Sequence, residues 1–230
     1  AALLPPGDVL RHHAINTSYD PRLRLLRPSP PVYELPGFLT GDECRALVEL
    51  ALPLLQPSPV VQLASSPGSG GAREVHGVSA SRTSTTCFLA RESCGALLAK
   101  VGALTGKPRE CFELVQVGRY LKGQFYRPHH DALDPHTELG REFVKDGGNR
   151  VLTVLLYLND VVRGGSTHFH HLDLRVKPER GKALVFFPAF ANGELDERAL
   201  HGAEEAEDEK WISQIWIRQY ARTPGQPSCA

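Results

Sequence analysis

The fold of this chain is decided by the run RVLTVLLYL at Arg150–Leu158, which is rich in branched aliphatic residues and predicts a buried β-strand. Similar runs are present at Phe112–Tyr120, Lys182–Phe187 and Trp211–Tyr220. Glycine-containing turns separate these runs, at residues 146–149, 163–166 and 179–181. Successive strands with no helix between them predict an antiparallel sandwich or barrel.

Two helices are predicted before these strands. Thr40 and Glu43 have the spacing of a capping box, and apolar residues recur at helical intervals over the next two turns. A second helix is expected from about residue 91 to residue 104, and Gly106 would end it. We therefore predict an α+β protein that is mainly β, with supporting N-terminal helices on one side of the strands.

The remaining segments give the expected domain limits. Residues 1–30 are rich in Pro and Arg and have no clear period, so we expect an irregular N-terminal arm. Residues 31–222 are expected to form a single domain, and residues 223–230 a C-terminal tail. Within the domain, residues 62–81 have the composition of a loop, and loops of this length are often lids over a site.

Composition excludes several classes of function. The chain has 41% hydrophobic and 23% charged residues, which is typical of a soluble globular protein. Its 26 basic and 26 acidic residues balance, so net charge favours neither a nucleic acid nor a membrane surface as partner. No apolar run approaches the roughly 20 residues of a membrane helix. Five cysteines do not form a disulfide framework, although Cys87 and Cys94 could pair.

A candidate metal site begins at His129-His130-Asp131, which follows a predicted strand. Residues two apart on an extended chain point to the same side, so His129 and Asp131 can converge on one ion. A third ligand must come from elsewhere, and His201 precedes the last predicted strand. Two imidazoles and one carboxylate leave open positions on iron(II), where a co-substrate and O₂ bind. His-x-Asp alone also occurs by chance, as a loop histidine beside a solvated aspartate. The residues further along the chain therefore decide between a metal site and this alternative.

The position of Lys210 favours a metal site at His129 and Asp131 over a chance occurrence of the motif. It follows His201 by nine residues and begins an apolar strand. A Lys directed into a barrel is costly unless an acid pairs with it, and the dicarboxylate 2-oxoglutarate is a natural partner. The alternative is an exposed charge after the acidic run at residues 204–209.

Taken together, these residues resemble the prolyl 4-hydroxylase family. The motifs that carry the resemblance are Pro36–Leu39, Arg82-Thr83-Ser84, Glu113–Tyr120, Gly123–Tyr126, His129-x-Asp131, Asn149–Asp160, Gly164-Gly165-x-Thr167-x-Phe169, Leu200-His201-Gly202 and Lys210-Trp211. They extend over roughly residues 31–220 and are similar to the plant and algal type and to the collagen-type catalytic domain.

Two departures from the family pattern accompany the resemblance. Residues 203–209 replace a Cys-Pro-Val-like stretch and shorten the interval before Lys210 by one residue. His170 stands where the family has Pro, and with His168 it could bind a surface metal. The plainer alternative for these two histidines is an exposed turn.

The resemblance implies a double-stranded β-helix (jelly-roll) core. It also implies that His129, Asp131 and His201 bind Fe(II). Lys210, Tyr120 and Thr167 would bind the co-substrate 2-oxoglutarate. The implied activity hydroxylates proline residues to 4-hydroxyproline, consumes O₂, releases succinate and CO₂, and uses L-ascorbate to restore oxidised iron.

The resemblance further implies a site for a proline-rich peptide in polyproline II form. Tyr126 and Arg150 would act in catalysis and, with Trp216, Arg82 and Ser84, would contact the peptide. Loops at residues 64–81 and 132–149 would close over it. An endoplasmic-reticulum or secretory location is favoured by the resemblance, with the cytoplasm as the alternative.

The residues themselves leave alternatives open. A strand Tyr or Trp commonly fills a core. If Arg150 faces inward it needs a substrate carbonyl or a carboxylate such as Glu113 as partner, and if it faces outward it is an ordinary surface charge. The same cofactor chemistry could act on a free amino acid or a cytosolic regulatory protein. A non-catalytic module that binds proline-rich peptides is a third hypothesis. No nucleic-acid partner and no membrane span are expected, and the oligomeric state stays open.

Overall fold

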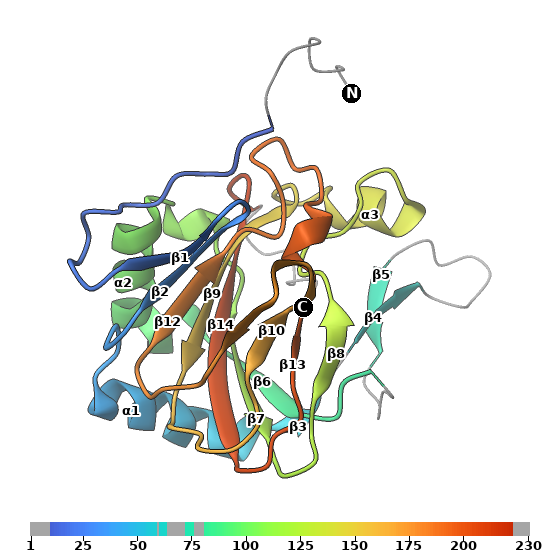
Figure 1. Ribbon diagram of the computed structural model, residues 1–230. Helices are drawn as coiled ribbons and strands as arrows, with labels where there is room; N and C mark the ends of the chain where they lie inside the picture. The colour runs from blue at the N-terminus through green and yellow to red at the C-terminus, as the bar shows by residue number, and fades with distance from the viewer. Residues whose placement is uncertain (1–9, 59, 64–71, 76–80, 223–230) are drawn as a thin grey trace.

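The computed structural model of the chain describes residues 10–58, 60–63, 72–75 and 81–222 (Figure 1). The largest sheet contains β1 (Arg24–Pro28), β2 (Pro31–Leu35), β3 (Gln56–Pro57), β6 (Thr85–Leu89), β7 (Val115–Tyr120), β9 (Arg150–Tyr157), β12 (Ala183–Phe186) and β14 (Lys210–Arg218). Their spatial order is β1-β2-β12-β9-β14-β7-β6-β3. The predicted mainly-β fold is confirmed.

A second sheet has four strands, β8 (Tyr126–His129), β10 (Thr167–Phe169), β11 (Leu174–Val176) and β13 (His201–Ala203), in the order β11-β10-β13-β8. A separate pair consists of β4 (Val60–Leu63) and β5 (Ala72–Val75). All strand pairings in the described part of the chain are antiparallel.

The helical elements are α1 (Gly41–Ala51), η1 (Leu52–Leu54), η2 (Arg91–Cys94), α2 (Gly95–Thr105), η3 (Arg109–Cys111), α3 (Glu138–Phe143), η4 (His170–Leu172) and η5 (Glu197–Ala199). Figure 1 shows α1 and α2 on one side of the large sheet and the four-stranded sheet on the other. None of the helices in the described ranges has the length and apolarity to cross a membrane.

The central strand β9 separates two hydrophobic layers. All its residues are buried, and Leu152, Val154 and Leu156 belong to the core that includes α1 and α2. Leu155 and Tyr157 point the other way, into the core between the two sheets. A strand buried on both faces has a continuous apolar sequence, and this explains the run that predicted it.

Both predicted helices are present. The Thr40 hydroxyl accepts a hydrogen bond from the Glu43 N–H at 3.2 Å, and the Glu43 carboxylate accepts from the Thr40 N–H at 2.8 Å. The second helix begins with the 3₁₀ turn η2 before α2 and ends at Gly106, whose φ of 68° is in the left-handed region. Glycine adopts this conformation without steric cost, as a helix end of this kind requires.

Several expectations were wrong in detail. Residues 24–28, expected in an irregular arm, form β1 and pair with β2, because an edge strand is held by backbone hydrogen bonds and needs no apolar period. The expected loop at 62–81 contains β5 and the end of β4, while its residues 64–71 and 76–80 lie outside the described part. The loop at 132–149 contains α3, which is capped by the Thr137 hydroxyl.

The cysteines of the described residues are not paired. Cys44, Cys87, Cys94 and Cys111 are buried free thiols, so the disulfide considered between Cys87 and Cys94 is absent. Burial raises the pKa of the Cys87 thiol to about 11, as expected for an inert core cysteine. Cys229 and residues 1–9 lie outside the described part of the chain.

Candidate metal centre and co-substrate pocket

Three predicted metal ligands meet where β8 pairs with β13. His129 ends β8, Asp131 lies two residues later, and His201 begins β13 directly opposite His129 in the pairing register. One ligand atom from each of these residues lies within 4.8 Å of the others. The Asp131 carboxylate oxygens are 3.6 Å from His129 Nε2 and 3.8 Å from His201 Nε2. This spacing leaves room for one ion between the three side chains.

Backbone carbonyls orient both imidazoles. His129 Nδ1 lies 2.9 Å from the Arg127 carbonyl oxygen, and His201 Nδ1 lies 3.0 Å from that of Ala199. A carbonyl can only accept, so Nδ1 carries the proton and Nε2 presents its lone pair toward Asp131. This is the arrangement by which proteins prepare histidines for metals.

The charges in the cluster also suit a cation. Burial lowers the pKa of His201 to about 4, so this imidazole is neutral at physiological pH. Burial would raise the pKa of Asp131, but His201 and His129 hold it well below its usual range. The Thr153 hydroxyl donates to Asp131 Oδ2 at 2.8 Å and fixes the carboxylate. Two imidazoles that present Nε2 and one carboxylate are the donor set that iron(II) accepts, so the residues fit the expected metal.

A pocket opens beside the cluster, between the two sheets. His129 and His201 line its metal end, while Tyr120, Thr167 and Lys210 line the remainder together with apolar side chains. Tyr120 lies opposite Lys210 in the pairing of β7 with β14. The Thr167 hydroxyl accepts a hydrogen bond from the Tyr157 hydroxyl at 2.8 Å. The three residues predicted to bind a co-substrate therefore share one cavity with two of the candidate metal ligands, His129 and His201.

Lys210 is buried in this pocket, with a relative exposure of 1%. Its ammonium donates to the Gly165 carbonyl oxygen at 2.6 Å, and no acidic side chain of the described residues forms an ion pair with it. Burial lowers the pKa of Lys210 to about 7, an effect that Glu204 only partly opposes. A buried ammonium without a counter-ion is costly, and a carboxylate in the pocket would relieve that cost.

The shortened acidic segment does not displace Lys210. β13 ends at Ala203 and β14 begins at Lys210, so the intervening residues form only a connection. Gly165 N–H donates to the Glu205 carbonyl oxygen at 2.9 Å, which ties this connection to the glycine turn. A Cβ at Gly165 would lie 3.2 Å from the Lys210 side chain, so the turn also leaves space for the ammonium.

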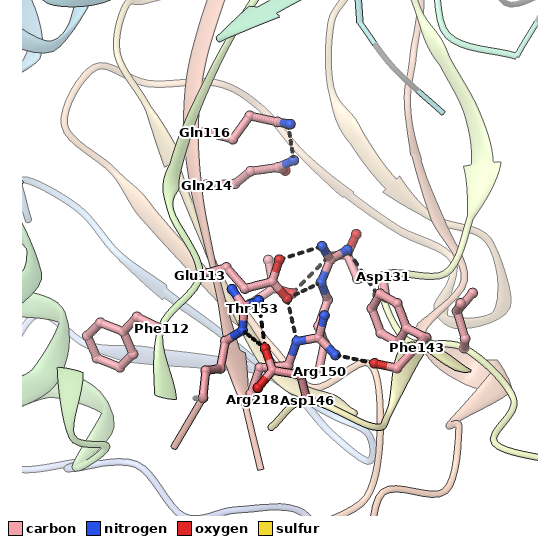
Figure 2. Close-up of polar contacts among 12 residues, drawn as sticks. Phe112, Glu113, Gln116, Asp131, Phe143, Asp146, Arg150, Thr153, Gln214 and Arg218 are labelled. Carbon is pink, nitrogen blue, oxygen red and sulfur yellow. Dashed lines mark hydrogen bonds and ion pairs between the residues drawn. The ribbon is translucent and has the colours of Figure 1, made fainter. Parts of the chain in front are cut away.

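Arg150 belongs to a buried ionic network beside the cluster (Figure 2). Its guanidinium forms two hydrogen bonds with the Glu113 carboxylate, at 2.7 and 2.6 Å. Of the two partners left open by the sequence, the carboxylate is the one observed. Arg218 donates to the same carboxylate at 2.6 Å. Burial would raise the pKa of Glu113, but Arg150 and Arg218 hold it at about 2.

This network reaches the metal cluster and Trp216. Arg150 Nη1 lies 3.4 Å from the Asp131 carbonyl oxygen, and its guanidinium carbon lies 3.8 Å from the centroid of the Trp216 ring. The indole Nε1 of Trp216 is buried and has no hydrogen-bond partner among the described residues. A buried N–H in this state can donate to a ligand oxygen without giving up another hydrogen bond.

The predicted residues Arg82, Ser84 and Tyr126 lie together on the neighbouring side. Arg82 donates to the Ser84 hydroxyl at 3.1 Å and to Gln116 at 3.0 Å. Its guanidinium carbon lies 4.7 Å from the Tyr126 ring centroid. The Tyr126 ring in turn stacks on His129, with 3.6 Å between centroids. The aromatic ring therefore connects a buried cation to a candidate metal ligand.

The surface histidines form no comparable cluster. The ring centroids of His168 and His170 lie 4.1 Å apart, and His168 Nδ1 lies 3.6 Å from Glu204. Arg175 already pairs with that carboxylate at 2.7 Å. In the described residues, the only group of three candidate ligands is His129, Asp131 and His201.

Sequence reasoning missed the supporting residues of this site. Arg218, Gln214 and Thr153 were not assigned a role, although all three contact the networks described above. Polar side chains at every fourth position of β14, in a largely apolar strand, were the signal that could have identified Gln214 and Arg218.

Comparisons with known proteins agree with this geometry. Residues 115–218 match the model of the 2OG-Fe(II) oxygenase superfamily, a segment that contains the three candidate ligands and Lys210. The chain is 35% identical to Prolyl 4-hydroxylase 1 of Arabidopsis thaliana over 212 residues, covering 84% of this chain and 70% of the relative. Probable prolyl 4-hydroxylase 6 of the same plant is 34% identical, with 87% and 73% covered.

A solved structure gives the same result. The viral collagen prolyl hydroxylase of Paramecium Bursaria Chlorella virus-1, in its 2OG complex, superposes with a TM-score of 0.61 and 25% identity, covering 81% of this chain and 95% of that one. Identity at this level over most of both lengths, together with the ligand cluster and pocket, shows that the chain belongs to the prolyl 4-hydroxylase family of 2-oxoglutarate- and Fe(II)-dependent oxygenases.

Proposed function

We propose that this protein hydroxylates proline residues of proline-rich peptides or proteins to 4-hydroxyproline, using Fe(II), 2-oxoglutarate and O₂ and releasing succinate and CO₂. The observation that carries the proposal is one cavity with two poles. At one pole the Nε2 atoms of two imidazoles face the Asp131 carboxylate, and at the other lies the buried ammonium of Lys210, which has no acidic partner among the described residues. A dicarboxylate that bridges a metal and a cation matches both poles.

His129, Asp131 and His201 are the proposed ligands of Fe(II). Their Nδ1 hydrogen bonds to backbone carbonyls fix the imidazoles with Nε2 directed at the ion. Bound iron would supply the oxidative decarboxylation of 2-oxoglutarate and the insertion of one oxygen atom into a C–H bond. The protein's part is to hold the three donors and to exclude water from the cavity.

Lys210, Tyr120 and Thr167 are the proposed 2-oxoglutarate residues. The Lys210 ammonium would pair with the carboxylate far from the metal, and the hydroxyls of Tyr120 and Thr167 would donate to it. Tyr157 supports Thr167 by donating to its hydroxyl, which leaves the Thr167 proton for the ligand. The apolar side chains Leu155 and Ile212 in the same cavity suit the methylene carbons of the ligand.

Tyr126, Arg150, Trp216, Arg82 and Ser84 are the proposed peptide residues, and Tyr126 and Arg150 are also the proposed catalytic residues. Support comes from Trp216 Nε1, which has no hydrogen-bond partner in the described part of the chain and is a donor suited to a peptide carbonyl. A polyproline II chain offers such carbonyls and no N–H at its prolines, and its rings pack on aromatic side chains. The solved structures similar in fold include a prolyl hydroxylase of Trichoplax adhaerens in complex with a peptide fragment.

Three further parts of the proposal follow from family membership. The two facing antiparallel sheets are proposed to form a double-stranded β-helix core. L-ascorbate is the proposed reductant that restores iron oxidised in uncoupled turnovers. Residues 31–222 are the proposed oxygenase domain, to which β1 and the segment before it add a strand and a covering layer.

Succinate formation tests the proposal. The Fe(II)-loaded protein is incubated with 2-oxoglutarate, with and without a poly-proline peptide, and succinate is quantified. Peptide-dependent succinate supports prolyl hydroxylation, whereas stimulation by a free amino acid alone would move the substrate to the amino-acid class. Peptide binding with no succinate under any condition would favour a non-catalytic binding module.

A further inference from the structure

The N-terminal segment crosses the loop that leads to His201. In Figure 1 the dark-blue chain before β1 passes beside the orange loop that precedes β13. The Ala191 N–H of this loop donates to the Arg11 carbonyl oxygen at 2.7 Å. His12, the next residue, is almost buried, and its ring stacks on Phe190 with 4.7 Å between centroids. The contact is therefore made by backbone and side chain together.

His12 bonds to the N-cap residue of η5, Asp196. His12 Nε2 lies 3.0 Å from Asp196 Oδ2, and Asp196 is 2% exposed. The other oxygen of this carboxylate accepts from the Arg198 N–H at 3.1 Å, which makes Asp196 the N-cap of η5. Arg198 also pairs with Asp196 through its guanidinium, at 2.8 and 2.7 Å. A buried carboxylate held from two sides fixes the start of this short helix.

η5 sets the position of a carbonyl that orients His201. Ala199 N–H donates to the Asp196 carbonyl oxygen at 3.0 Å, and the Ala199 carbonyl accepts from His201 Nδ1 at 3.0 Å. A continuous set of hydrogen bonds therefore joins His12, Asp196, Ala199 and His201. If one of these hydrogen bonds is weakened, the His201 ring is freer to rotate or to change its tautomer.

We propose that His12 is a positioning residue for His201, through which the N-terminal segment supports the candidate metal centre. The inference rests on the proposed function, because the orientation of His201 matters for binding a metal. His12 makes no contact with the cluster itself. Its effect passes through Asp196 and η5, and a proton on Nε2 is all that the interaction requires of its imidazole.

Three variants separate the hydrogen bond from packing. His12→Phe keeps an aromatic ring against Phe190 and removes the hydrogen bond to Asp196. His12→Gln places an amide N–H at a similar distance from the backbone and restores it. His13→Ala is the matched control, because His13 is the neighbouring histidine and contacts Lys107 instead, at 3.3 Å. All three variants are made in the full chain and compared with the wild-type protein of the same length.

Two measurements report on His201 without turnover. Co(II) affinity is measured by titration of its visible absorption, and long-range ¹⁵N–¹H NMR of histidine-labelled apoprotein reports the tautomer of His201. Supporting residues of metal sites typically change affinity about 10–100-fold, and His12 acts one step further out, so about a 3- to 10-fold loss is expected for His12→Phe. Wild-type affinity is expected for His12→Gln and His13→Ala, and only His12→Phe should lose the pure Nδ1–H form of His201.

The outcomes decide between the inference and the proposed function. Wild-type Co(II) affinity and tautomer in His12→Phe would overturn the role of His12. Equal losses in His12→Phe and His13→Ala would also overturn it, because they would show general destabilisation. Failure of the wild-type protein to bind Co(II) would count against the proposed metal site, and the apoprotein tautomer would still decide the role of His12.

Discussion

Replacing Lys210 by Met is expected to stabilise the apoprotein and to abolish 2-oxoglutarate binding. The side chain is fully buried, and burial lowers the pKa of its ammonium from 10.5 to about 7. At about 1.36 kcal/mol for each pKa unit, the charged ammonium is less stable by about 5 kcal/mol in the folded protein than in the unfolded chain. Methionine has a similar length and carries no charge, so it avoids this cost.

The net gain in stability should be smaller than that value. Loss of the hydrogen bond to the Gly165 carbonyl subtracts about 1 kcal/mol, and water penetration lowers the effective charging cost. We therefore expect the Lys210→Met apoprotein to gain about 3 kcal/mol at pH values below 7. In a chain of this size that gain raises Tm by roughly 6–12 °C.

The pH dependence has a definite sign. The folded-state pKa of Lys210 is lowered, so between about 7 and 10.5 the unfolded chain binds a proton that the folded chain does not. Stability of the wild-type apoprotein should therefore rise with pH through this window. The advantage of Lys210→Met should be largest below pH 7 and should vanish as pH approaches 10.5.

The assay is thermal unfolding, first of the apoprotein and then of the Mn(II)-loaded protein with and without 2-oxoglutarate. At 100 times its Kd, the ligand should stabilise the wild-type protein by about 2.7 kcal/mol and should leave Lys210→Met unchanged. Lys122→Met is the control, because Lys122 is exposed and its loss should change neither quantity. A Lys210→Met protein that is less stable than wild type at pH 6, or that still responds to 2-oxoglutarate, would refute this account.

Other predictions concern the networks around the candidate metal cluster. Glu113→Gln leaves Arg150 and Arg218 without a counter-charge and should lower the free energy of unfolding in urea by about 3–5 kcal/mol at neutral pH. Because Arg150 and Arg218 lower the pKa of Glu113, this loss should shrink as pH falls from 4.5 toward 2, and an unchanged urea midpoint would contradict the prediction. Thr153→Val removes the hydrogen bond to the Asp131 carboxylate and should weaken Co(II) binding about 10-fold or more with little change in Tm, whereas wild-type affinity would show that this bond has no role. Trp216→Phe keeps an aromatic ring under Arg150 and removes the indole donor, so the KM for a proline-rich peptide should rise while peptide-independent succinate formation is unchanged; an unaltered KM would exclude the indole from peptide binding.

The long elements could be predicted because their patterns are local. β9 and β14 consist mainly of branched aliphatic and aromatic residues, and the capping box of α1 spans only four residues, Thr40 to Glu43. The strands of the smaller sheet contain three or four residues each, which is too short for a period to develop. They are fixed by backbone pairing with partners distant in sequence, and no single segment encodes that pairing.

The candidate site divides in the same way. The metal cluster and Lys210 could be predicted, because residue type and order along the chain already specify their chemistry. The partner of Arg218 could not be predicted, since only the folded arrangement of β14 brings this residue to the carboxylate of Glu113. The link from His12 to His201 joins residues 189 positions apart through backbone carbonyls, which carry no sequence signal at all.

The most direct test of the central claim follows the oxygen atoms. The Fe(II)-loaded protein is incubated with 2-oxoglutarate, a proline-rich peptide and heavy-isotope dioxygen, and the products are analysed by mass spectrometry and amino-acid analysis. Our account predicts one heavy oxygen atom in succinate and one in the peptide, recovered as 4-hydroxyproline, and neither product in His201→Ala. Unmodified peptide with succinate formed at the same rate in its absence would contradict prolyl hydroxylation as the function of this site.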